Sequence, residues 1–200
     1  MSHLRPALVL LILFTALTGF IYPLAVTGVA QRLFAHQANG SLIEKDGKVI
    51  GSELIGQNFA SEKYFHSRPS AIAGPDPKDS SKTVATPYDA SNSMGSNAGP
   101  TAQALIDRVR GEVAALKKEN PAAVVPIELV TSSASGLDPH ISPAAALFQM
   151  PRIARARGLG EDRVRGLIAS HIEERWLGVF GEPVVNVLEL NLALDDAAVP

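Results

Sequence analysis

Four side chains that could take part in chemistry lie close together in residues 133–146, SASGLDPHISPAAA. They are Ser135, Asp138, His140 and Ser142, residue types used by nucleophilic hydrolases and by small metal sites. A hydrolytic triad, however, is assembled from distant segments, and the sequence has no Gly-x-Ser-x-Gly stretch. Asp138 and Ser142 each precede a proline, which predicts a turn and a helix N-cap. We therefore expect these side chains to satisfy backbone groups, and we assign no catalytic residue.

The spacing of the histidines gives no support for a metal site. Two ligands on one helix face would be three or four residues apart, and no pair of histidines in the sequence has that spacing. The chain also lacks cysteine, so a thiolate ligand is excluded. The histidines are His3, His36, His66, His140 and His171. We expect neither a metal ion nor a tightly bound cofactor.

Composition limits the class of protein. The 200 residues are 46% hydrophobic and 19% charged, which is enough for one globular core with an appended segment. The formal net charge of −2 at pH 7 gives no general attraction to nucleic acid. Recognition of an anionic partner would therefore have to come from a local group of basic residues.

An uncharged segment near the N-terminus is the strongest physical signal in the sequence. Pro6–Ala30 contains no charged side chain, and a helix of that length would rise about 37 Å, more than the roughly 30 Å hydrocarbon core of a bilayer. We predict a cytoplasmic stub over residues 1–5, a transmembrane helix over 6–30 and a mixed α/β domain over 31–200. A cleaved signal peptide that ends at the small residue Ala30 is the alternative. Flanking charges do not decide the side on which the domain lies, because long domains translocate largely regardless of them.

Local patterns predict several elements of the domain. Asp46-Gly47 lies between short apolar runs and predicts a tight hairpin within residues 41–56. Residues 67–100 contain seven Ser, five Pro and three Gly, which predicts a long loop with ordered turns. Apolar residues recur at helical spacing from Thr101 to Lys118 and predict an amphipathic helix.

The C-terminal half contains further predicted elements. VVPIELV (124–130) is rich in β-branched residues and predicts a short strand at a sheet edge. Ser142-Pro143 predicts the start of a helix. EPVVNVLELNLALD (182–195) is largely apolar and predicts a long, mostly buried strand. The fold class that these elements indicate is mixed α/β.

The segment RIARARGLGEDRVRGLI (152–168) allows two interpretations. Its five arginines surround a break at Gly158–Gly160 between two predicted helices, a spacing that would suit a helix-turn-helix on DNA. The alternative is a helix pair whose arginines are solvated or paired with neighbouring acids, which we favour. The second helix is expected to continue to Trp176 with a core-facing stripe that includes His171. A membrane-tethered DNA-binding protein remains the alternative function, and it requires this segment to lie in the cytoplasm.

Five longer motifs follow one another along the chain. They are YFHSRPSA (64–71), YDASNSMGSNAGPT (88–101), VPIELVTSSASGLDPHISPAAA (125–146), QMPRIARARGL (149–159) and GEPVVNVLELNLALD (181–195). With the N-terminal span, these motifs closely resemble the KdpC family, the C subunit of the potassium-transporting ATPase complex. The resemblance covers nearly the whole chain and implies a single-pass protein of the bacterial inner membrane.

The function that the resemblance implies is that of an accessory subunit. Its partners would be a channel-like potassium-binding subunit, a P-type ATPase subunit, a small membrane subunit and membrane lipid, with no nucleic acid. ATP and potassium would be handled by the complex as a whole. The sequence agrees with a non-catalytic role, since it has neither a Walker-type Gly-rich loop nor the Asp-Lys-Thr-Gly stretch of a phosphorylated ATPase.

The resemblance also implies two statements that are difficult to combine. Gln149 in the Q-x-P-R motif would touch ATP, and the large domain would lie outside the membrane, where cytoplasmic ATP does not reach it. We prefer the hypothesis that the external domain covers the potassium entrance and stabilises the complex through the loop before the 101–118 helix. The docking candidates in this loop are Ser67, Arg68, Pro69, Tyr88, Asp89, Ser96, Asn97, Gly99 and Pro100.

Overall fold

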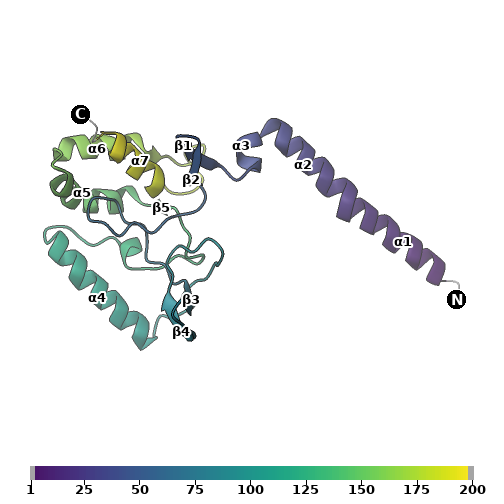
Figure 1. Cartoon of the computed structure of the whole chain (residues 1–200), viewed down its shortest axis with the longest axis horizontal. Coiled ribbons are helices and arrows are strands. Elements are labelled where there is room, and N and C mark those ends of the chain that lie inside the picture. The colour runs from purple at the N-terminus through teal and green to yellow at the C-terminus, as the bar shows by residue number, and fades with distance from the viewer. Residues whose placement is uncertain (1–2, 198–200) are drawn as a thin grey trace. The chain divides into compact units, whose positions relative to one another are not determined.

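The computed structural model describes residues 3–197 of the chain and divides into two units between Ser52 and Glu53. The first unit contains a long N-terminal helix, the short helix α3 (Ala35–Ala38) and a β-hairpin (Figure 1). The second unit contains the remaining strands and helices. The predicted fold class is confirmed, since the structure combines helices with small sheets and has one long apolar helix at the N-terminus.

The N-terminal helix runs without interruption from Leu4 to Leu33. It consists of α1 (Leu4–Ala16), a π-helical segment (Leu17–Ile21) and α2 (Tyr22–Leu33). Its most apolar window has a mean hydropathy of 2.3 and is 0% buried by the rest of the chain, whereas a core helix would be covered. The helix therefore fits a single-pass membrane anchor, and it extends past both ends of the predicted span.

The hairpin of the first unit confirms the turn predicted at Asp46-Gly47. Strands β1 (Leu42–Lys45) and β2 (Lys48–Ser52) pair in antiparallel fashion on either side of it. Both turn residues have positive φ, 53° for Asp46 and 73° for Gly47, as a two-residue type I′ turn requires.

The core of the second unit lies between a small sheet and three helices, which Figure 1 shows grouped together. Strand β7 (Val184–Asn186) lies between β5 (His140–Ile141) and β6 (Ile172–Glu173), and both pairings are antiparallel. The helices are α5 (Pro143–Arg157), α6 (Glu161–Ser170) and α7 (Val187–Ala197). The largest fully buried apolar side chains of this core are Phe65, Ile141, Ile153, Ile168, Leu190 and Leu194.

The predicted start of α5 is confirmed. The Ser142 hydroxyl accepts a hydrogen bond from the Ala145 N–H at 3.1 Å, and Pro143 occupies the first turn, where a missing N–H is harmless. Gly158, at φ 66°, ends the helix in the left-handed conformation. Pro151 lies inside α5 and marks neither of its ends.

The long loop predicted for residues 67–100 is wrong in part. It contains a hairpin of β3 (Ala73–Asp76) and β4 (Asp79–Ala85), because Asp76 and Asp79 accept hydrogen bonds from the N–H groups of Lys78 and Ser81 and so hold a tight turn between two short strands. The rest of the segment has no helix or strand among the described residues. The amphipathic helix predicted next is confirmed as α4 (Gln103–Glu119).

One predicted strand is absent, and another is much shorter than predicted. Residues 127–129 form a single 3₁₀ turn (Ile127–Leu129), in which Ile127 is exposed and so gains nothing from pairing in a sheet. The strand predicted for 182–195 ends at Asn186, because the Asn186 side chain accepts hydrogen bonds from the N–H groups of Leu188 and Glu189 and so caps α7.

The helix predicted to run to Trp176 ends at Ser170. His171 is half-buried at its C-terminal end, with its Nδ1 atom 2.8 Å from the Leu167 carbonyl oxygen. Trp176 does not face the core, because the chain turns into β6 and then into a hairpin that carries the indole ring into solvent.

Candidate functional site

The backbone of residues 62–66 is held by side chains from α5 and α7. Asn191 forms two hydrogen bonds with Phe65, accepting from its N–H at 2.8 Å and donating to its carbonyl oxygen at 3.0 Å. Gln149 does the same at His66, accepting at 2.8 Å and donating at 3.1 Å. Both amides are buried. Each therefore gives a residue that lies outside any helix or strand the pair of bonds that a neighbouring strand would give.

Two arginines of α5 bind the carbonyl groups just before this point. Arg152 donates to the carbonyl oxygens of Glu62 and Tyr64, and its Nε atom lies 2.8 Å from the Glu119 carboxylate. Arg157 donates to the Lys63 carbonyl oxygen at 2.7 Å and pairs with Asp195 at 2.7 Å. We call the side chains Gln149, Arg152, Arg157 and Asn191 the clamp.

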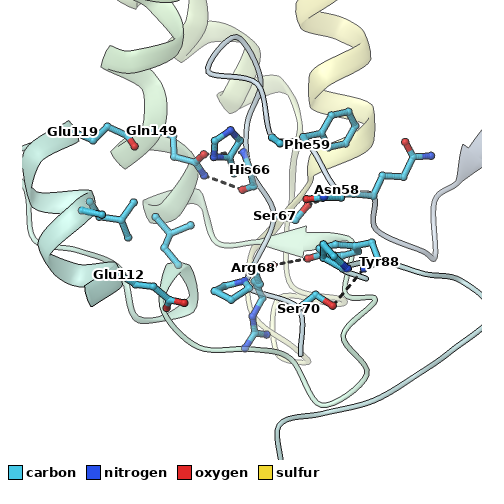
Figure 2. Close-up of a pocket in the computed structure, with 17 residues that line it drawn as sticks. Asn58, Phe59, His66, Ser67, Arg68, Ser70, Tyr88, Glu112, Glu119 and Gln149 are labelled. Carbon is cyan, nitrogen blue, oxygen red and sulfur yellow. Dashed lines mark hydrogen bonds between the residues drawn. The ribbon is translucent and has the colours of Figure 1, made fainter. Parts of the chain in front are cut away.

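The clamp positions residues 66–68 along the wall of an open pocket of about 470 Å³ (Figure 2). Helix α4 supplies another wall through Glu112, Ala115, Leu116 and Glu119. The clamp reaches both walls, since Arg152 pairs with Glu119 while Gln149 holds His66. The remaining lining residues are Gln57, Asn58, Phe59, Ala60, His66, Ser67, Arg68, Pro69, Ser70, Pro87, Tyr88, Leu129 and Gln149.

Tyr88 and Arg68 form a polar network at one end of the pocket. The Tyr88 hydroxyl donates to the Arg68 carbonyl oxygen at 2.8 Å, and the Arg68 guanidinium pairs with Asp138 at 2.9 Å. Burial raises the pKa of Tyr88 to about 12, so the phenol remains protonated and keeps donating at physiological pH. Tyr88 also has a φ of 63°, a conformation that is unfavourable for a bulky side chain.

His66 lies at the other end of the pocket and is held in its neutral form. Burial, and next to it the positive charge of Arg152, lower the pKa of His66 from its ordinary 6.5. Its Nε2 atom lies 3.0 Å from the Ser61 carbonyl oxygen, which accepts a hydrogen bond from the N–H of the neutral ring.

The structure brings together four of the nine predicted docking residues. Ser67, Arg68, Pro69 and Tyr88 line the pocket and are half-buried. Asp89 follows Tyr88 and is exposed, and hydrogen bonds from Ser91 lower its pKa. The other four do not line the pocket and are exposed on the segment that leads to α4; they are Ser96, Asn97, Gly99 and Pro100. A docking role for these residues stays a prediction.

Gln149 is 2% exposed, and both ends of its amide are engaged. Its oxygen accepts hydrogen bonds from the His66 N–H and from Arg152, and its nitrogen donates to the His66 carbonyl oxygen. Contact with ATP stays a prediction, and it would require the amide to leave His66.

The residues of the 133–146 segment have the turn and cap roles predicted for them. Ser142 caps α5 and also donates to Glu128, while Asp138 accepts from the His140 N–H at 3.1 Å and pairs with Arg68. The Ser135 hydroxyl accepts from the Leu137 N–H at 3.1 Å. Among residues 3–197, no three His, Asp or Glu side chains form a group that could hold a metal ion.

The helix pair predicted around Gly158 is confirmed as α5 and α6. Arg152 and Arg157 pair with acids, as the favoured interpretation expected, and are therefore not free to contact nucleic-acid phosphates. Their bonds to backbone carbonyl groups, and the roles of Asn186 and Asn191, were missed. The signal was present in the sequence, because an asparagine within an apolar run such as VVNVLELNL must find hydrogen-bond partners when it is buried.

Known proteins match this chain over nearly its whole length, which includes the pocket and the clamp. A model of the KdpC family, described as K+-transporting ATPase, c chain, matches residues 4–196. The potassium-transporting ATPase KdpC subunits of Methylorubrum extorquens and Bradyrhizobium diazoefficiens are each 63% identical to the chain over 198 residues, 99% of this chain and 98% of the relative. That of Rhodopseudomonas palustris strain BisB18 is 62% identical over 197 residues, 98% of this chain and 99% of the relative. The resemblance inferred from the motifs is confirmed.

Replacing Asn191 with alanine should destabilise the domain, because it leaves the N–H and carbonyl groups of Phe65 buried without partners. Each unsatisfied group costs about 1–3 kcal/mol, so unfolding should be easier by about 2–5 kcal/mol. The measurement is guanidinium unfolding of the detergent-purified full chain, followed by circular dichroism. Gln103→Ala is the matched control, since that exposed amide bonds only Asp107, and it should change stability by less than about 0.5 kcal/mol. Equal unfolding free energies of the two variants would show that the Asn191 hydrogen bonds do not stabilise the domain.

The lowered pKa of His66 predicts a loss of stability in acid. The unfolded chain takes up the proton near the ordinary pKa of 6.5, whereas the folded chain takes it up only at lower pH. The His66 contribution is therefore fully present above about pH 6.5 and is lost as pH falls from there towards the folded-state pKa. The check is the difference in unfolding free energy between the parent and His66→Gln between about pH 7.5 and pH 5. Between these pH values the parent should lose more unfolding free energy than His66→Gln does. Equal losses in the two proteins would contradict the lowered pKa of His66.

Proposed function

Because the chain belongs to the KdpC family of potassium-transporting ATPase subunits, we propose that it is a non-catalytic accessory subunit of an ATP-driven potassium import complex. It stabilises assembly of the complex and promotes ATP binding or hydrolysis by the P-type ATPase subunit. The observation that carries this proposal is the family match over residues 4–196, which includes both the apolar helix and every residue of the clamp. The match thus extends to the elements that would hold the subunit in place.

In this proposal the chain is anchored by the Leu4–Leu33 helix in the bacterial inner membrane, with its large domain outside. Its partners are a channel-like potassium-binding subunit, the P-type ATPase subunit and a small membrane subunit. A length of 30 residues supports the anchor, because it exceeds the roughly 20 residues needed to cross the hydrocarbon core. ATP and potassium are then bound by the complex, and this chain holds no cofactor tightly.

The proposed docking surface is the loop of residues 67–101 with the α4 helix that follows it, including the pocket wall around Tyr88, placed so that the domain covers the potassium entrance. Two features support this choice. Tyr88 and Asn97 both have positive φ, 63° and 49°, and such conformations in residues other than glycine are concentrated at functional sites. The clamp and the Arg68–Asp138 pair also hold the backbone of the pocket wall in one conformation, so little conformational entropy is lost on docking.

Changing Tyr88, Asp89 and Asn97 together to alanine should weaken docking. We expect about a tenfold lower potassium affinity in transport assays, corresponding to about 1.4 kcal/mol, or a reduced yield of the complex. The matched control changes three exposed residues of α6, Glu161, Asp162 and Arg165, to alanine.

Tyr88 is partly buried, so the Asp89→Ala, Asn97→Ala double variant keeps the experiment interpretable if the triple variant does not fold. Normal assembly and transport by the folded variants would refute this docking surface. An equal loss in the α6 control would do the same, because the effect would then not be specific to the loop.

An introduced cysteine should report on which side of the membrane the domain lies. The chain has no native cysteine, and Ala115 is exposed on α4. In intact spheroplasts, Ala115→Cys should react with a membrane-impermeant thiol reagent, whereas Val9→Cys within the anchor helix should not. Reaction only after lysis would place the domain in the cytoplasm. It would then favour a DNA-binding role for residues 152–168 or direct contact between Gln149 and ATP.

A further inference from the structure

The hairpin between β6 and β7 ends in exposed apolar side chains, where the sequence had predicted a core-facing residue. Trp176, Leu177, Val179 and Phe180 are 69%, 73%, 72% and 59% exposed. They lie in the sequence WLGVFG, which has no charged residue, and we call residues 176–180 the apolar tip. Four large apolar side chains on one short turn form a concentrated patch, in contrast to the scattered apolar residues common on protein surfaces.

The backbone of the apolar tip satisfies most of its own hydrogen-bonding groups. The N–H of Trp176 donates to the Phe180 carbonyl oxygen at 2.9 Å, and the N–H groups of Val179 and Phe180 donate to the Trp176 carbonyl oxygen at 3.2 and 3.0 Å. The Gly178 N–H donates to the Arg175 carbonyl oxygen at 2.9 Å. These N–H groups therefore need no water, which lowers the free-energy cost of moving the turn from water into the bilayer interface.

The turn itself indicates that an apolar side chain is required at its end. Leu177 and Gly178 both have positive φ, 52° and 72°, as in a type I′ turn. Asn, Asp or Gly normally occupies the first of these positions, since other side chains are unfavourable there. A leucine that is 73% exposed and in the left-handed region gains little from the fold. Its presence is explained if the side chain meets an apolar environment elsewhere.

Charge is confined to the base of the hairpin. Arg175 and Glu182 form an ion pair across it, and Glu173 and Glu174 precede them. The rings of Trp176 and Phe180 lie above this pair, with their centroids 5.6 Å apart. The hairpin thus changes from charged to aromatic to aliphatic along its length, which is the order of environments from water through lipid headgroups to acyl chains.

We propose that the apolar tip inserts into the interfacial region of the lipid bilayer. The proposal rests on the membrane anchoring proposed above, because an anchor on the same chain keeps the domain beside a membrane surface. Lipid is favoured over a protein partner by the graded polarity of the hairpin and by the position of Trp176, a residue type that concentrates at bilayer interfaces. Acidic residues outnumber Arg175 at the base, so the contact requires no anionic lipid.

The test uses Trp176 itself, because it is the single tryptophan of the chain. The full-length protein is reconstituted into phosphatidylcholine vesicles with and without bromine on the acyl chains. Brominated lipid should lower Trp176 emission by about half, and the emission maximum should lie further to the blue than in the variant Leu177→Asp. Leu177→Asp and Val179→Asp should each abolish most of the quenching, because a carboxylate at the tip opposes insertion.

The matched control variants are Val124→Asp and Ile127→Asp, which place the same charge at apolar positions that are at least as exposed as Val179, 90% and 72%, outside the tip. They should leave the quenching unchanged. Absence of quenching in a protein that floats with the vesicles would overturn the proposal while leaving the anchor intact. Failure to float would instead refute the anchoring. Shielding of Trp176 that appears only after the other subunits are added would assign the tip to a protein contact and would also overturn the proposal.

Discussion

The four side chains of the clamp determine how the second unit is built around residues 62–66. This stretch belongs to no helix or strand, and its polar groups bond to amide and guanidinium groups: Asn191 at Phe65, Gln149 at His66, and arginines at the three carbonyl groups before them. Because Asn191 belongs to α7 and the other three belong to α5, the stretch also ties these helices together. A buried amide that loses its partner is penalised far more than the bond itself contributes, so the arrangement tolerates few alternatives.

The same interaction explains the spacing of the Q-x-P-R motif. Gln149 and Arg152 are three residues apart and therefore lie on one face of α5, where the Arg152 guanidinium also donates to the Gln149 oxygen at 2.9 Å. Pro151 falls between them without ending the helix. The motif thus has a structural role at the wall of the pocket, independent of any nucleotide. Its effect reaches α4 through the Arg152–Glu119 pair, so that the pocket walls and the core are one connected structure.

Local patterns predicted the parts of this fold that are determined locally. The uncharged run of Pro6–Ala30, the Asp46-Gly47 turn and the Ser142 cap each carry their physical cause within a few residues. The strand predicted for 182–195 failed because a short buried apolar run suits a strand or a helix equally well, and only the hydrogen bonds of Asn186 decide between them. The apolar run around Asn191 indicates that this amide needs partners, but the partners themselves could not be predicted, since Phe65 and Asn191 are 126 positions apart and spacing carries no information about such pairs. Four of the nine docking candidates lie together because two motifs meet at Tyr88 and Arg68.

Attachment to the membrane at two points would give the accessory role a physical basis. A domain joined to a membrane by one helix can rotate about that link, and most of its orientations turn any given face away from a partner in the same membrane. Insertion of the apolar tip supplies a second contact, and two contacts restrict rotation far more than one because the second binds at a high effective concentration. The rigid clamp then matters for orientation as well as for stability, since a domain that deformed would not transmit the position of the tip to Tyr88. In this view the subunit assists transport by presenting one fixed surface, a task that requires no catalytic residue of its own.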